Sequence, residues 1–268
     1  DTASPIDIHF YINGQFAGSV NAADTREDIA RADGGYFEYG AAHGFAVNLP
    51  KFAGQNEVCA YGKNVSAGSD TLLGCKTVQT DLDDFPLAPP AAGRHYYWPW
   101  IDGEGGYDWR LMANVSNAAK KSFDLNIAGR SVKLGLLANP VVNPEKSFFI
   151  NFLGITGGPV VLTSLTGDPA VVSQRVLWAG KSLEEIPGKG SESLASHFYW
   201  PWYDQQTPGM ANWVMLANPS HESLYYEITI GGNDPGPGST GTLNPEGIAY
   251  PSFPGKLTGP VTVRSCSH

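Results

Sequence analysis

The sequence has little charge, few cysteines and no long apolar run, and each of these absences excludes a class of protein. Only 16% of the 268 residues are charged, and the formal net charge of −9 comes without any cluster of Lys and Arg. This composition argues against nucleic acid or an anionic membrane surface as a partner, because both need concentrated positive charge. No run reaches the roughly 20 apolar residues that a membrane-spanning helix needs, so we expect no membrane insertion.

Glycine and proline are abundant instead, with 32 Gly and 20 Pro. This composition predicts many short strands joined by tight turns, and no long helices. The chain is long enough for two or three domains, since domains cluster near roughly 100 to 150 residues. We therefore predict an all-β protein of three β-sandwich, Ig-like domains in series.

The last two of these domains are a tandem repeat. The motif His-Tyr-Tyr-Trp-Pro-Trp-Ile-Asp at 95–102 returns as His-Phe-Tyr-Trp-Pro-Trp-Tyr-Asp at 197–204, an offset of 197 − 95 = 102. Gly-Pro-Val at 158–160 returns at 259–261, an offset of 259 − 158 = 101. A nearly constant offset indicates one duplicated domain, because short solenoid repeats have periods of roughly 20 to 50 residues. The first copy continues into Val-Val-Ser-Gln-Arg-Val-Leu-Trp at 171–178, and the second copy is expected to lack this last strand.

These patterns predict four segments. Residues 1–82 form a small β-domain, 83–94 a semi-rigid Pro/Ala linker, 95–196 the first repeat and 197–268 the second repeat. In the first segment, period-two alternation over 6–12 followed by Asn13-Gly14 predicts a hairpin, and a further strand is expected at 45–49. The chain starts without Met or a signal peptide, so we expect a mature or excised piece of a larger protein.

The three cysteines are an odd number. Cys59 and Cys75 lie in strand-like runs on either side of a polar, Gly-containing loop, and such a pair can bridge adjacent antiparallel strands. A disulfide there would indicate an oxidising compartment, whereas the alternative is two unlinked buried thiols. Cys266 has no evident partner within the chain.

The duplicated aromatic residues are the main candidates for a binding site. Alternation along a strand places one set on a common face, where Trp rings can stack on sugar rings. The alternatives are that they fill the core of each sandwich or lie between modules. The candidate ligand-binding residues are Tyr96, Trp98, Trp100, Tyr199, Trp200 and Trp202.

The remaining motifs give little indication of a catalytic or metal site. His95 with Asp102, and His197 with Asp204, are spaced seven apart, which on a strand places each pair on opposite faces and opposes a shared metal or acid–base site. Asn64 and Asn114 are the first residues of glycosylation sequons. The alternative is that these short motifs occur by chance. We therefore expect no catalytic residue, no metal site and no cofactor, and predict that the chain is not an enzyme.

Two resemblances cover nearly the whole chain. Residues 5–78, with Pro-Ile-x-Ile-His-Phe-Tyr-Ile-Asn-Gly at 5–14 and Leu-Leu-Gly-Cys at 72–75, resemble a module of secreted actinobacterial and similar proteins. That module accompanies cell-wall hydrolases, glycosidases and surface proteins and is regarded as non-catalytic. The repeats, with Trp-Pro-Trp, Ala-Asn-Pro and Gly-Pro-Val, are similar to an uncharacterised extracellular repeat of such bacteria. The resemblance implies architecture rather than an activity.

Both ends of the chain resemble domains cut at a strand boundary, which suggests a segment of a larger polypeptide or a subunit completed by a neighbour. We expect a secreted or cell-surface, non-catalytic structural or adhesive component, assembling head to tail by strand complementation. Its expected partners are other copies of itself or the rest of a larger polypeptide. The alternative is a carbohydrate-binding accessory segment of a secreted hydrolase, with cell-wall glycan as its ligand.

Overall fold

The protein is all-β in the computed structural model. The structure describes residues 4–267 apart from 27–40, 53, 67, 86, 89, 104–109, 115–119, 133–140, 152–153, 168 and 179–181. Within these residues the elements are strands and short 3-10 turns, which confirms the predicted class. None of the described helical segments has the length and apolar character needed to cross a membrane. The chain divides into two compact units, Asp1–Thr80 and Asp81–His268.

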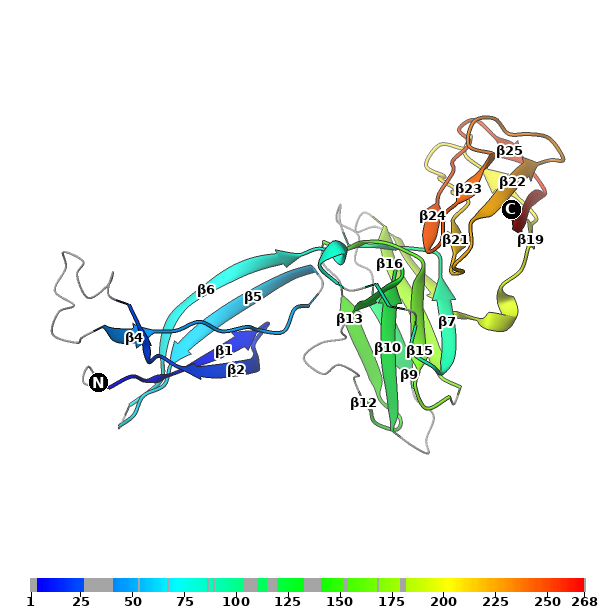
Figure 1. Ribbon diagram of the computed structural model, residues 1–268. Helices are drawn as coiled ribbons and strands as arrows, with labels where there is room; N and C mark the ends of the chain where they lie inside the picture. Colours follow the sequence, from blue (N-terminus) through cyan, green and yellow to red (C-terminus); the bar gives the residue numbers. More distant parts are fainter. Residues whose placement is uncertain are drawn as a thin grey trace. The chain divides into compact units, whose positions relative to one another are not determined.

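The first unit contains a four-stranded antiparallel sheet in the order β2-β1-β5-β6 (Figure 1). Its strands are β1 (Asp7–Ile12), β2 (Gln15–Asn21), β5 (Gly54–Gly62) and β6 (Thr71–Thr80). The predicted hairpin is present: Asn13 and Gly14 join β1 to β2 with φ of 50° and 78°, as a two-residue turn of this hand requires. Alternation in β1 buries Ile8 and Phe10, which form a small core with Ala22.

Outside this sheet, the first unit has a short ladder of β3 (Asp24–Thr25) and β4 (Ala42–Gly44). The prediction of a strand at 45–49 is wrong, because those residues belong to no strand. Phe45 contacts the core instead, with its ring edge-on to Phe10 at a centroid distance of 5.8 Å. Phe45 and Val47 are nevertheless 38% and 36% exposed, and Leu49 packs partly buried against the same core, so the run forms neither a paired strand nor a buried segment.

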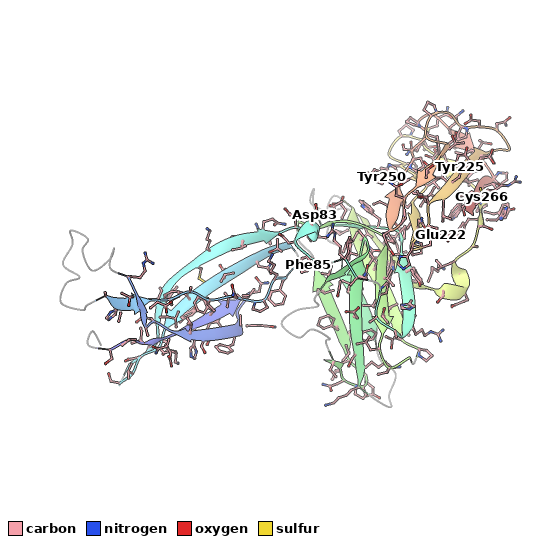
Figure 2. All side chains as sticks on the ribbon, in the orientation of Figure 1. Asp83, Phe85, Glu222, Tyr225, Tyr250 and Cys266 are labelled. Carbon is pink, nitrogen blue, oxygen red and sulfur yellow. A yellow bond between two sulfur atoms is a disulfide. The ribbon has the colours of Figure 1, made fainter. Side chains whose placement is uncertain are left out.

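The Pro-rich segment expected to be a linker belongs to the second unit and packs against the first repeat. It contains the 3-10 turn η2 (Leu82–Asp84) and the buried side chain of Phe85 (Figure 2). Arg130 donates to the carbonyl of Phe85 over 2.8 Å and pairs with Asp83 at 2.8 Å. These contacts fasten the segment to the first repeat.

The first repeat contains two sheets. One has the order β11-β10-β15-β7-β18, with β12 on β10, and the other has the order β13-β9-β16-β17. The strands of the first sheet are β7 (Arg94–Trp98), β10 (Lys121–Ile127), β11 (Arg130–Val132), β12 (Val141–Val142), β15 (Val160–Ser164) and β18 (Lys189–Gly190). Those of the second are β9 (Arg110–Asn114), β13 (Ser147–Asn151), β16 (Val171–Trp178) and β17 (Ser182–Pro187). A two-stranded ladder joins β8 (Ile101–Asp102) to β14 (Thr156–Gly157).

The second repeat has the same kind of first sheet and a smaller second one. Its sheets are β19-β26-β22-β23, β21-β24 and β20-β25. The strands are β19 (His197–Trp200), β20 (Tyr203–Asp204), β21 (Leu216–Asn218), β22 (Leu224–Ile230), β23 (Thr240–Leu243), β24 (Gly247–Ala249), β25 (Leu257–Thr258) and β26 (Val261–Ser267). The 3-10 turn η3 (Ser191–Ser193) precedes the repeat.

The two repeats have the same strand register in their first sheets. Val160 lies opposite Trp98 on one side and Ile127 on the other. Val261 likewise lies opposite Trp200 and Ile230. The duplicated sequence therefore builds duplicated backbone, and residues can be compared one to one between the repeats.

A buried asparagine holds the turn after β21 in the second repeat. Asn218 is fully buried, and its amide nitrogen donates to the carbonyls of Glu222 over 2.7 Å and Asn244 over 3.0 Å. Its side-chain oxygen accepts from the Ser220 hydroxyl over 2.7 Å. The side chain thus takes the place of several backbone hydrogen bonds.

Replacing Asn218 with alanine is expected to destabilise the second repeat. Buried carbonyls left without a donor cost about 1–3 kcal/mol, and we expect a loss of that size in the free energy of unfolding. Urea unfolding followed by hydrogen exchange of peptides from 197–267 measures it. The exposed Asn233→Ala serves as a control, and equal stability of the two variants would contradict the role given to Asn218.

Candidate functional site

In the first repeat the candidate aromatic residues belong to the core. Tyr96 and Trp98 are 6% and 1% exposed, so neither presents a ring face to a ligand. The Trp98 indole donates to the carbonyl of Ile186 over 2.9 Å, and the Tyr96 hydroxyl accepts from the amide of Ala170 over 2.7 Å. Trp100 is half-buried, with its ring 6.4 Å from that of Tyr250.

In the second repeat the matching residues are exposed. Tyr199, Trp200 and Trp202 are 67%, 42% and 59% exposed. The ring of Trp200 stacks on that of Phe198, with 6.1 Å between the centroids. The same motif is therefore core in one copy and surface in the other, a difference that sequence comparison alone did not reveal.

The cover over Trp98 comes from residues 171–178 and 182–190, which we call the closing segment. A Cβ added to Gly188 would lie 2.8 Å from Cζ2 of Trp98, so the backbone of this glycine rests against the indole ring. Ile186 accepts the indole hydrogen bond, and Gln174 donates to the carbonyl of Trp100 over 2.9 Å. Val172 and Val176 are buried beside them.

The closing segment also occupies two sheet edges. Its strand β16 pairs with β9, and its strand β18 pairs with β7. In the described part of the second repeat, the corresponding strands β21 and β19 each pair on one side only, with β24 and β26. Two strand edges and Trp200 are thus open in the second repeat at the places that the closing segment covers in the first. We call these edges together with Trp200 the open side.

The histidines and aspartates of the repeated motif do not meet. Asp102 accepts from the hydroxyl of Thr156 over 2.9 Å, while His95 contacts the hydroxyl of Thr163 at 3.0 Å. Asp204 accepts from the backbone amide of Thr207 and from that of Gln206, and these hydrogen bonds lower the pKa of its carboxyl. Asp102 is therefore engaged with the neighbouring strand β14, and Asp204 with the loop that follows it.

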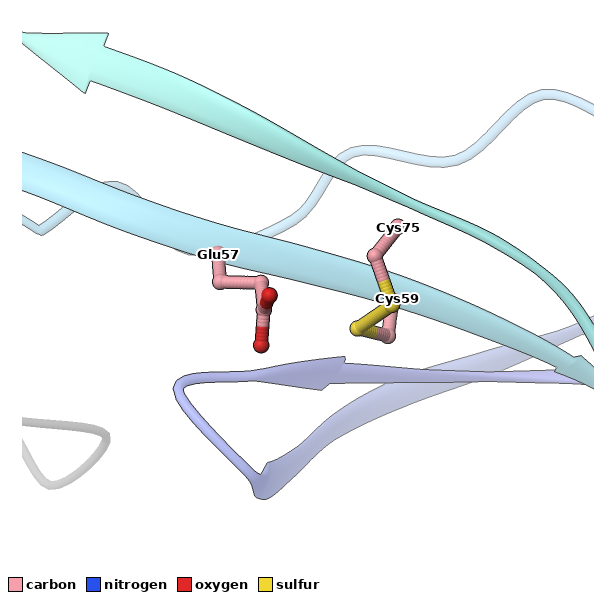
Figure 3. Close-up of side chains that lie close together, drawn as sticks. All are labelled: Glu57, Cys59 and Cys75. Atoms are coloured by element: carbon pink, nitrogen blue, oxygen red, sulfur yellow. A yellow bond between two sulfur atoms is a disulfide. The ribbon is translucent and has the colours of Figure 1, made fainter.

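The predicted disulfide is present. Cys59 and Cys75 lie opposite each other on β5 and β6 with a Cα separation of 4.0 Å, and they are bonded. Glu57 lies beside them (Figure 3), and the three side chains form the one cluster of potential metal ligands among the described residues. Because the two sulfur atoms are bonded to each other, neither is a thiolate that could bind a metal ion. The cluster therefore offers no cysteine ligand.

The other candidate residues are scattered. Cys266 is a free, exposed thiol on β26, beside Tyr225 of β22 (Figure 2). Asn64 is exposed, and its side-chain oxygen accepts from the amide of Ser66 over 3.1 Å. The side chain of Asn114 lies outside the described residues.

A cavity of about 510 Å³ lies in the second unit, lined by residues of both repeats. Its charged residues include Arg130, which pairs with Asp83, and Glu246. Oε2 of Glu246 is buried without a hydrogen-bond partner among the described residues, and Oε1 lies 3.7 Å from Nδ1 of His221. Burial raises the pKa of the Glu246 carboxyl, and the His221 imidazole opposes part of that rise.

Glu246→Gln is expected to stabilise the second unit at neutral pH. Because the folded pKa of Glu246 lies above the unfolded one, the folded state binds the proton more tightly. The free energy of unfolding therefore falls as pH rises from about 4 through the folded pKa. The glutamine of the variant does not titrate, so this loss of stability with rising pH is absent. The variant should therefore have a higher free energy of unfolding than the parent at neutral pH and the same one in acid. Urea unfolding across that range measures it, and a variant less stable than the parent at neutral pH would contradict the assignment.

Comparison with known proteins adds no relative. No family model, no curated protein and no solved structure matches this chain.

Proposed function

We propose that the chain is a non-catalytic structural or adhesive component of an extracellular surface, joined to a neighbouring polypeptide by strand complementation of its second repeat. One observation carries the proposal: Trp200 is 42% exposed where its counterpart Trp98 is 1% exposed under the closing segment. Open strand edges invite pairing with another chain, because their backbone groups are left to solvent. An exposed tryptophan beside such edges adds apolar area to bury.

Three further features support this proposal. The disulfide is consistent with an oxidising compartment, such as the cell exterior. The duplicated repeats are typical of modular surface proteins, and we propose that each of the three domains is an Ig-like sandwich. We also propose that residues 5–78 are a non-catalytic module of a secreted protein, which would agree with a structural role.

Size-exclusion chromatography and electron microscopy of the purified chain test head-to-tail assembly of copies. If copies join through the open side, larger species or filaments form as concentration rises, and Trp200→Glu returns the chain to monomers. The matched variant Phe16→Glu changes an exposed aromatic residue of the first unit and should leave assembly intact. A monomer without filaments at every concentration contradicts assembly of this chain with itself.

A second function is favoured by the same exposed rings. Trp200 and Trp202, two residues apart on a strand and its continuation, are 42% and 59% exposed, as the rings of a carbohydrate-binding surface are. Tyr199, 67% exposed, lies on the opposite face of the strand. A glycan array and a peptidoglycan pull-down test this function. Binding that is lost in Trp200→Ala and retained in Phe16→Ala would support a carbohydrate-binding segment, and no binding to any glycan would reject it.

A further inference from the structure

The two repeats contact each other at β24 and at the turn that joins it to β23. Ile248 lies against the backbone of Gly158 in the first repeat, where an added Cβ would be 3.1 Å from Cγ2 of the isoleucine. The ring of Tyr250 lies 6.4 Å from that of Trp100. We call these contacts, together with Glu246 at the turn itself, the joint between the repeats.

Glu246 brings a carboxyl group into this joint. A Cβ added to Gly129 would lie 2.9 Å from Cγ of Glu246, so the side chain rests against the turn between β10 and β11 of the first repeat. The side chain is 14% exposed, and Oε2 is buried without a hydrogen-bond partner among the described residues. Burial without donors costs more for a carboxylate than for a neutral carboxyl group. The joint therefore favours the protonated form of Glu246.

Two positively charged or protonatable side chains lie near Glu246. Nδ1 of His221 is 3.7 Å from Oε1, but the imidazole is 74% exposed, so solvent and salt screen its attraction. Arg130 lines the same cavity, and its guanidinium is engaged by Asp83 at 2.8 Å and by the carbonyl of Phe85. Neither group replaces the hydration that the carboxylate loses, and burial leaves the pKa of Glu246 raised.

The acidic groups nearby act in the same direction as burial. Asp81 and Asp83 line the cavity with Glu246, and like charges disfavour a further carboxylate. Burial raises the pKa of the Tyr97 hydroxyl on β7, and the charge of Glu246 adds to that rise. An ionised Glu246 is therefore felt in the first repeat as well as in its own.

We infer that the joint is a pH-dependent contact, in which protonation of Glu246 docks the two repeats against each other and its ionisation releases them. The inference does not rest on the proposed function. When the repeats separate, the carboxylate is hydrated and its pKa returns toward the ordinary value, whereas burial raises this pKa in the docked state. The docked state thus binds the proton more tightly. Docking is strongest below the pKa of the separated repeats and is lost as pH rises through the docked pKa.

The test measures the distance between two spin labels on the full chain by double electron–electron resonance. Cys266 of the second repeat is a free, exposed thiol, and Val171→Cys adds one to the first repeat at a position that is 72% exposed. A narrow distance distribution is expected at about pH 4 and a broad one at about pH 8. Each unit by which docking raises the pKa of Glu246 lowers the ratio of docked to separated chains about tenfold over this range. Dilution with unlabelled chain removes signals between molecules.

The duplication supplies a matched pair of variants. Asn-Pro-Glu at 244–246 repeats Asn-Pro-Glu at 143–145, and both glutamates have positive φ, 53° at Glu246 and 59° at the exposed Glu145. Glu246→Gln removes the charge in the joint and should give the narrow distribution at both pH values. Glu145→Gln makes the same change outside the joint and should leave the pH dependence of the parent unchanged.

A variant on the other side of the joint tests the contact itself. Gly129 has a φ of 71°, which Asn tolerates, and Gly129→Asn adds a side chain where Cγ of Glu246 lies. This variant is expected to give the broad distribution at both pH values, and a narrow one at both overturns the assigned contact. Equal distributions at the two pH values in the parent overturn the inference. A Glu246→Gln variant that still broadens at about pH 8, or loss of the pH dependence in Glu145→Gln, overturns it as well.

Discussion

Replacing Trp98 with alanine is expected to destabilise the first repeat by about 3–5 kcal/mol, the range for removing a large aromatic side chain from a core. Trp98 is 1% exposed, and its indole donates to the carbonyl of Ile186. The substitution leaves a cavity between β7 and the closing segment and a carbonyl without its donor. Both effects lower the free energy of unfolding of the first repeat.

The duplication supplies the matched control for this variant. Trp200→Ala makes the same chemical change at the equivalent position, where the side chain is 42% exposed. We expect a loss of about 1–2 kcal/mol there, smaller than at Trp98, because 42% of the residue's surface already lies in solvent. Urea unfolding followed by hydrogen exchange of peptides from 94–190 and 197–267 measures the two repeats separately. Equal losses in the two repeats would contradict the difference in burial.

Removing the disulfide is expected to destabilise the first unit by about 3 kcal/mol in the chain-entropy model for a loop of about 15 residues. The cysteines are 16 residues apart and join β5 to the edge strand β6. The buried core described for this unit is small, with Ile8, Phe10 and Ala22 at its centre. The covalent link is therefore a large part of what holds β6 in place.

The double variant Cys59→Ala with Cys75→Ala tests this expectation without a reductant. Hydrogen exchange at β5 and β6 should accelerate strongly, and the urea midpoint of the first unit should fall. Cys266→Ser, which changes the free and exposed thiol, is the control and should leave the first unit unchanged. Unchanged exchange at β6 in the double variant would show that the sheet does not depend on the bond.

Local patterns predicted local structure in this chain. Asn13-Gly14 predicted a hairpin because few residues adopt the positive φ that its turn requires. Cys59 and Cys75 predicted a bond because strand-like runs on either side of a short loop bring opposite residues together. The apolar run at 45–49 was predicted to be a strand and is not, since strand pairing depends on a distant partner that the run does not encode.

The candidate aromatic site shows the limit of such patterns. The sequence by itself determined that a domain is duplicated and that the second copy is not followed by a counterpart of β16 within these residues. It did not distinguish Trp98 from Trp200, because the two residues have nearly identical neighbours in the chain. Only the tertiary structure decided which one is buried, because the cover over Trp98 comes from Ile186 and Gly188, about ninety residues further along the chain. Burial depends on the segment that folds back over a residue, and among the described residues such a segment covers Trp98 but not Trp200.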